Sequence, residues 1–244
     1  SFYHKGLLRD QEDIANAVGK DNIFEVARNL CRFDGKYYGI THSPNTNLLI
    51  YRKDIFKAKG LKPPETWDEF IQVAQAMMER DASGRVTRYG VSLPGVGLFV
   101  NILVAELTKA NGGRLFDLTT GRPTFTEKQV VEVLDFYKKL NDTVLPPGWL
   151  GHGYLDTFTN LATGKAAMVY QGHGRSAGYI EKYAPKGTGT PEYFGVIRKP
   201  HGPSGKETAA QVDAEPWMIF KNSKHPEEAA EFIKFFFKEK NYIK

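Results

Sequence analysis

Apolar positions at helical spacing mark the clearest element of the chain. Phe70, Ala74 and Met77 fall on one face of a helix with a period of 3.6 residues. Just before them, Thr66-Trp67-Asp68-Glu69 matches a capping box, in which the threonine hydroxyl and the glutamate carboxylate satisfy free backbone amides. A similar box at 126–129 predicts the start of a second amphipathic helix. Further helices are predicted at 10–32 (where Gly19 favours a break), 54–59, 98–110, 155–162, 176–183 and from residue 226.

Short runs rich in β-branched and aromatic residues lie between these segments and predict strands. The runs are 37–41, 48–52, 89–93, 166–170, 193–198 and 211–220. Helical and strand segments alternate along the chain, which predicts a layered α/β fold with a largely parallel sheet. In such sheets, ligands bind on loops beyond the carboxyl ends of the strands.

Composition narrows the class of protein. The 244 residues are 41% hydrophobic and 13% aromatic, which suits one large globular unit or two lobes. The formal net charge is +5, but Lys and Arg are scattered along the chain, so we expect no nucleic-acid partner. No stretch of about 18 apolar residues occurs, so we expect no membrane span.

The residues that usually carry catalysis or metal binding form no recognised pattern. Cys31 is the single cysteine, which excludes an internal disulfide. The histidines show no HxxxH or HExxH spacing, and no GxSxG elbow, Walker A loop or Cys-His signature is present. The GxG at 172–174 is too short for a dinucleotide fingerprint. We therefore expect no metal and no cofactor.

The first cluster of candidate binding residues follows the predicted strand 37–41. His42, Ser43 and Asn45 lie in a polar turn that also contains Pro44. A turn that satisfies its own hydrogen bonds is the ordinary interpretation of such a sequence. We favour contact with a ligand, because these side chains offer more polar groups than one turn uses. The stretch is then expected to cross between two lobes and to contribute to a cleft.

Two further clusters stand at a helix start and a strand end. Phe99 and Asn101 open the apolar helix at 98–110, where a core residue and a helix-start residue are the ordinary interpretations. Gln171, His173 and Arg175 follow the buried strand at 166–170. The glycines between them let the backbone approach a ligand, or simply make the turn. Histidine and arginine can donate to hydroxyls or to a carboxylate.

The fourth cluster is Asp213-Ala214-Glu215-Pro216-Trp217. On an extended segment, a period of two puts Asp213, Glu215 and Trp217 on one face. Pro216 has no amide to donate, so an edge strand or a bend is predicted rather than a central strand. Two carboxylates beside an indole suit a sugar site, and the same pair is also the minimum set for a glycoside hydrolase.

Short motifs continue along most of the chain in a fixed order. They are Asp34-Gly35-Lys36, Asn45-Thr46-Asn47, Pro63-Pro64-Glu65-Thr66-Trp67-Asp68-Glu69-Phe70, Asn111-Gly112-Gly113, Gly164-Lys165-Ala166-Ala167-Met168 and His225-Pro226-Glu227. As a set, together with the four clusters, they resemble the extracellular solute-binding proteins of ABC importers, in the carbohydrate-binding family that includes maltose-binding protein.

The resemblance implies a type II periplasmic-binding-protein-like fold, whose two lobes close on a carbohydrate and deliver it to a membrane permease. It also implies that the four clusters contact the ligand, that no catalysis occurs, and that the protein works in the periplasm or outside the cell, associated with the membrane through the transporter. We expect a monomer. Residues 1–40 are expected to form part of a first lobe, 41–212 a second lobe, and 213–244 a return to the first.

Two departures from the family pattern modify these expectations. The family begins with strand–helix–strand units that have no counterpart before Ser1, and it ends with helices that have none after Lys244. We therefore expect the N-terminal units and C-terminal helices of the family fold to be absent from the chain. His173 and Arg175 stand where relatives often have an aromatic residue, which favours an acidic sugar or a phosphorylated polyol over a stacked neutral sugar.

Two other functions remain open. One is a glycoside hydrolase in which Asp213 and Glu215 act as the paired carboxylates. The other is a receptor of the same fold for an anionic or cationic ligand that is not a sugar. Strong dependence of binding on salt would favour a charged ligand.

Overall fold

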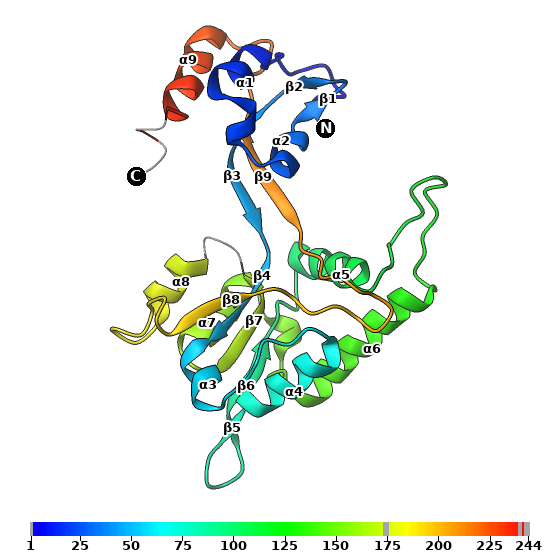
Figure 1. Cartoon of the computed structure of the whole chain (residues 1–244), viewed down its shortest axis with the longest axis vertical. Coiled ribbons are helices and arrows are strands. Elements are labelled where there is room, and N and C mark those ends of the chain that lie inside the picture. Colours follow the sequence, from blue (N-terminus) through cyan, green and yellow to red (C-terminus); the bar gives the residue numbers. More distant parts are fainter. Residues whose placement is uncertain (1, 173–175, 239–240, 242–244) are drawn as a thin grey trace. The chain divides into compact units, whose positions relative to one another are not determined.

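The chain separates into two compact units. The computed structural model describes residues 2–172, 176–238 and 241, so the candidates His173 and Arg175 lie outside the described residues. The small unit comprises Ser1–Asn45 and Val212–Lys244, and the large unit is the uninterrupted segment Thr46–Gln211. Figure 1 shows the elements of both along the chain, and each unit is described by itself.

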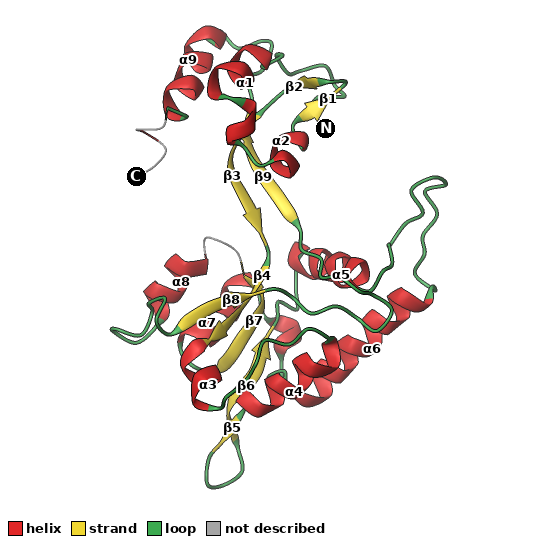
Figure 2. Cartoon of the chain, in the orientation of Figure 1, coloured by secondary structure: helices red, strands yellow, loops and turns green. Residues whose placement is uncertain are grey.

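A five-stranded sheet forms the centre of the large unit, in the order β5-β6-β7-β4-β8 (Figure 2). Its strands are β4 (Leu48–Arg52), β5 (Glu79–Arg80), β6 (Val86–Ser92), β7 (Ala166–Gly172) and β8 (Phe194–Ile197). β6 and β7 pair in parallel, whereas β4 pairs antiparallel with both β7 and β8, and β5 pairs antiparallel with β6. The expectation of a largely parallel sheet is therefore wrong, because β4 enters between two strands that run the other way.

Helices cover both faces of this sheet (Figure 2). They are α3 (Lys53–Ala58), α4 (Trp67–Met77), α5 (Leu98–Ala110), α6 (Lys128–Thr143), α7 (Tyr154–Ala162) and α8 (Ser176–Tyr183). All of β7 is buried, and its side chains contribute to two cores. Tyr170 joins the main core with Phe70 of α4, whereas Val169 joins a second core with Phe158 of α7.

The two predicted capping boxes have different outcomes. The Thr66 hydroxyl accepts from the Glu69 N–H at 3.3 Å, and the Glu69 carboxylate accepts from the Thr66 N–H at 3.2 Å, so the predicted start of α4 is confirmed. The prediction of a capping box at 126–129 is wrong, because Glu127 is the N-cap of α6 and no side chain caps that helix. A backbone turn, in which the Thr124 carbonyl accepts from the Glu127 N–H at 3.0 Å, places the start one residue later.

The small unit is built from short elements at both ends of the chain. These are α1 (Glu12–Val18), a 3₁₀ helix (Lys20–Asn22), α2 (Glu25–Asn29), β1 (Arg32–Phe33), β2 (Lys36–Tyr37), β3 (Ile40–Thr46), β9 (Val212–Trp217) and α9 (Pro226–Phe236). Its core joins Ile14 of α1 to Tyr37 of β2 and to Ile233 of α9. The break favoured by Gly19 is confirmed, since this residue ends α1 with a φ of 85°.

The polar turn predicted at 42–47 is wrong. Residues 40–46 are extended as β3, which pairs with β9 in a two-stranded sheet. The turn preference of Pro44 and Asn45 is local, whereas the hydrogen-bonding partner of this segment comes from far along the chain. Pairing with that partner overrides the local preference.

Candidate ligand-binding site

Three strands of the large unit end at one edge of its sheet, which we call the carboxyl edge. β6 and β7 are parallel, and β8 runs the same way because both β7 and β8 are antiparallel to β4. β4 begins at this edge, where Leu48 lies opposite Gly172. Loops and helix starts at such an edge are the usual place for ligands in α/β folds. Three predicted residues stand here: Phe99 and Asn101 follow β6, and Gln171 lies at the end of β7.

A pair of stacked aromatic rings stands at the helix starts near this edge. Phe99, in the first turn of α5, stacks on Tyr154 with ring centres 4.1 Å apart and planes inclined by 15°. Tyr154 is the first residue of α7, whose start is fixed by Asp156 accepting from the Gly153 N–H at 2.7 Å. Tyr154 is not among the residues predicted from the sequence. Asn101, by contrast, is exposed on α5.

Gln171 is a buried amide without a hydrogen-bond partner in the described part of the chain. Its side chain is 0% exposed, and neither Nε2 nor Oε1 has a partner in the structure. Gln171 and Tyr170 together lie opposite Leu49, where the register between β4 and β7 shifts. An unpartnered buried donor or acceptor costs about 1–3 kcal/mol. Such a group is therefore a natural candidate to bind a ligand hydroxyl or an ordered water.

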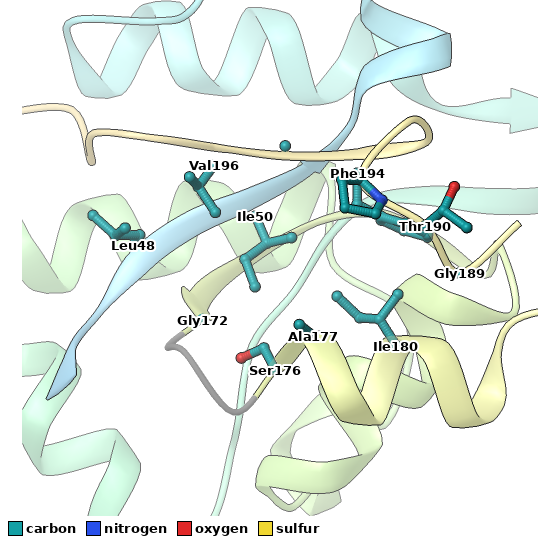
Figure 3. Close-up of a pocket in the computed structure, with 12 residues that line it drawn as sticks. Leu48, Ile50, Gly172, Ser176, Ala177, Ile180, Gly189, Thr190, Phe194 and Val196 are labelled. Carbon is teal, nitrogen blue, oxygen red and sulfur yellow. The ribbon is translucent and has the colours of Figure 1, made fainter. Parts of the chain in front are cut away.

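An apolar cavity of about 340 Å³ lies between β4 and α8 of the large unit (Figure 3). Leu48 and Ile50 of β4 form one wall, and Ala177 and Ile180 of α8 lie across from them. The hydroxyls of Ser176 and Thr190 are the main polar groups in its described lining. This volume is within the range of small-ligand sites, but apolar walls offer little to the hydroxyls of a sugar. None of the predicted residues that the structure describes lines this cavity.

In the small unit, the structure brings two predicted residues together. The rings of His42 on β3 and Trp217 on β9 have centres 5.1 Å apart. Trp217 also stacks on Phe232 of α9, with ring centres 5.3 Å apart and planes inclined by 24°, and touches Phe236 at 4.5 Å. The indole is half-buried, so part of its surface packs on these aromatic neighbours and part is accessible to a ligand.

The polar candidates of the small unit are distributed over the same two strands. Asp213 is exposed and Glu215 is half-buried on β9, two residues apart. On β3, Ser43 and Asn45 are both half-buried, and the Asn45 amide donates to the Ser43 carbonyl at 3.5 Å. These strands therefore carry carboxylate, hydroxyl and amide groups, which are the groups that bind hydroxyls.

The sequence profile of the family described as bacterial extracellular solute-binding protein matches residues 9–243. The chain belongs to this family. Among curated proteins it is 29% identical over 168 residues to the mannitol-binding protein of Pseudomonas aeruginosa, covering 67% of this chain and 37% of that protein. It is 28% identical over 147 residues to a probable amino-acid ABC transporter periplasmic-binding protein of Sinorhizobium fredii, covering 58% of this chain and 32% of that protein.

Solved structures show the same fold. A solute-binding protein of Agrobacterium vitis with bound D-mannitol has a TM-score of 0.79 at 24% identity, covering 98% of this chain and 57% of that chain. Maltose-bound T. maritima MalE3 has a TM-score of 0.82 at 21% identity, covering 98% and 60%. These matches confirm the predicted two-lobed, periplasmic-binding-protein-like α/β fold. The chain spans between about a third and three fifths of the length of these four proteins.

Two features are absent from the part of the chain that the structure describes. No helix there has both the length and the apolar character needed to cross a bilayer. Within the same residues, no three His, Cys, Asp or Glu side chains gather as they would around a metal ion.

Proposed function

We propose that the chain is part of the substrate-binding receptor of an ABC importer, which binds a sugar or a polyol without covalent change and delivers it to a membrane permease. Membership of the solute-binding family over residues 9–243 carries this proposal. A relative named for mannitol binding and fold neighbours with bound mannitol and maltose support this class of ligand. The receptor would act as a monomer in the periplasm or outside the cell.

In this proposal the large unit contributes an aromatic surface and a free amide. The stacked rings of Phe99 and Tyr154 offer an apolar face for the C–H groups of a sugar or polyol. The amide of Gln171 can both donate to and accept from a hydroxyl, and it has no partner among the residues that the structure describes. Asn101 on α5 is a further polar contact, and His173 and Arg175 complete the predicted set from this unit.

The small unit contributes the second set of proposed contacts. These are His42, Ser43, Asn45, Asp213, Glu215 and Trp217 on β3 and β9. Their carboxylate, amide and hydroxyl groups suit a ligand rich in hydroxyls, and Trp217 provides an indole beside them.

We propose that this pair of carboxylates binds rather than catalyses. A glycoside hydrolase needs two carboxyl groups that flank the scissile bond. Asp213 and Glu215 are alternate residues of one strand, so both project from the same face of β9. They would reach one side of a ligand and would not lie on opposite sides of a bond.

The test is a thermal-shift screen of the purified chain with mannitol, ribitol, maltose, glucuronate, a phosphorylated polyol and amino acids. One ligand should raise the melting temperature saturably, by about 5–10 °C at 100 times its dissociation constant. Nuclear magnetic resonance of the recovered ligand should show it unchanged. No response to any of these compounds would refute the proposal, and hydrolysis of a bound glycan would favour the enzyme.

A further inference from the structure

A buried ion pair lies at the place where the chain enters and leaves the large unit. Glu106 of α5 and Lys199, which follows β8, have side chains that are 5% and 2% exposed, and their Oε2 and Nζ atoms are 2.6 Å apart. The ammonium of Lys199 also lies 5.5 Å from the centre of the Tyr170 ring. Burial lowers the pKa of Lys199, and the charge of Glu106 partly opposes that shift. Burying two charges is expensive unless further hydrogen bonds satisfy them.

The second oxygen of Glu106 supplies those bonds and holds both segments that connect the units. Its Oε1 atom accepts from the side-chain amide of Asn47 at 3.3 Å and from the backbone N–H of Gln211. Asn47 and Gln211 also bond directly, because the Asn47 N–H donates to the Gln211 carbonyl at 3.3 Å and the Asn47 amide donates to Gln211 Oε1 at 3.3 Å. One carboxylate therefore ties together two segments that are far apart in sequence.

This hydrogen-bonded network lies next to both boundaries of the large unit. The chain passes into the large unit between Asn45 and Thr46 and leaves it between Gln211 and Val212. Asn47 is thus the second residue of the large unit, and Gln211 is its last. A buried ion pair is weak evidence for stability, because apolar side chains of similar volume often serve as well. Its better-supported use is to specify one arrangement of the chain.

We propose that Glu106 is a positioning residue that fixes both connecting segments to the large unit. Any movement of one unit against the other is then absorbed on the small-unit side of Asn47 and Gln211, in β3 and β9. Hinges in proteins are commonly a few residues at the ends of elements, which absorb the change in backbone torsion. This role does not depend on which ligand the protein binds, and it stands or falls separately from the proposed function.

The test compares the parent chain with a Glu106→Met/Lys199→Met double variant, which removes the ion pair and both ties but keeps the apolar volume. Nitroxide labels on Lys62→Cys in the large unit and Lys224→Cys in the small unit, both exposed positions, are placed in a Cys31→Ala background. Double electron–electron resonance without ligand measures the distribution of distances between the labels. We expect the double variant to broaden this distribution about twofold or more, because the connecting segments are no longer fixed.

A second variant and a control make the result decisive. Asn47→Ala removes the tie of one segment and leaves the ion pair, so it should broaden the distribution less than the double variant does. Leu161→Ala opens a cavity in the second core, away from the network, and should lower the melting temperature without broadening. The proposal is overturned if both network variants keep the parent's width. It is also overturned if Leu161→Ala broadens the distribution equally, because the width would then report lost stability alone.

Discussion

Replacing Gln171 with methionine should stabilise the ligand-free protein and abolish its response to ligand. The Gln171 side chain is 0% exposed, and its two polar atoms have no partner within residues 2–172, 176–238 and 241. An unsatisfied buried polar group costs about 1–3 kcal/mol. Methionine has a similar length and carries no amide, so we expect the free energy of unfolding to rise by about 1–3 kcal/mol. In a chain of this size, each 1 kcal/mol corresponds to a change of about 2–4 °C in the melting temperature.

The chain offers a matched control in Gln11. This residue is also 0% exposed, and its amide also has no partner among the described residues, but it lies in the small unit and is not a candidate for ligand contact. Gln11→Met should therefore give a similar gain in stability and leave the ligand response intact. Urea unfolding followed by tryptophan fluorescence measures stability, and the thermal shift with a saturating ligand measures binding.

Two results would refute this reasoning. A Gln171→Met variant that is less stable than the parent by about 1 kcal/mol or more would mean that the amide is satisfied in solution, for example by an ordered water. A stabilised Gln171→Met variant with the parent's full ligand response would remove Gln171 from the binding site.

Further predictions concern a helix start, the aromatic pair and alkaline pH. Thr66→Ala should lower the free energy of unfolding by about 1 kcal/mol, because it removes the N-cap of α4, whereas Thr126→Ala should change it by less than about 0.5 kcal/mol in the same urea titration. Tyr154→Ala should weaken ligand binding about tenfold, because it removes the ring that stacks on Phe99, whereas Tyr154→Phe should bind like the parent. Calorimetry measures both affinities, and a Tyr154→Ala variant that binds as tightly as the parent would place the aromatic pair outside the site. Burial raises the pKa of Tyr170 well above its usual value of 10.0. The Tyr170 hydroxyl therefore loses its proton at lower pH in the unfolded chain than in the folded one, and the free energy of unfolding should fall as the pH rises above about 10. Urea unfolding of Tyr170→Phe should show a smaller fall with pH. The same fall in the variant and the parent would show that Tyr170 does not cause it.

Elements with local signals can be predicted from the sequence, and those with distant partners cannot. The start of α4 depends on Thr66 and Glu69, which are three residues apart. β3 depends on β9 at the other end of the chain, so the turn-forming residues around Asn45 give a misleading signal. The direction of β4 is likewise set by its pairing with β7 and β8, which no local pattern specifies.

The residues of the candidate site also differ in whether a local sequence signal identifies them. Gln171 can be selected as a polar residue at the end of a buried strand, but its lack of a partner depends on what surrounds it in space. Tyr154 is missed because its stacking partner lies on another helix, and an aromatic residue at a helix start is a weak signal. Glu106 had a signal that could have been used, since it is the one charged residue in the first eleven of the apolar segment 98–110. A lone carboxylate in such a helix needs a partner, and Lys199 supplies it.

The insertion of the large unit within the small unit has a consequence for synthesis of the protein. Every strand of the five-stranded sheet has been made once Gln211 is added, so the large unit can fold while the chain is still growing. β3 is made early and remains without its partner until β9 follows. During that interval β3 presents an unpaired edge, which is a site for wrong association. Pro44 lies in this strand and has no amide hydrogen to donate, and a proline at an edge limits such pairing. We therefore expect Pro44, which gives a misleading turn signal in the sequence, to limit wrong pairing of β3 while the chain is growing.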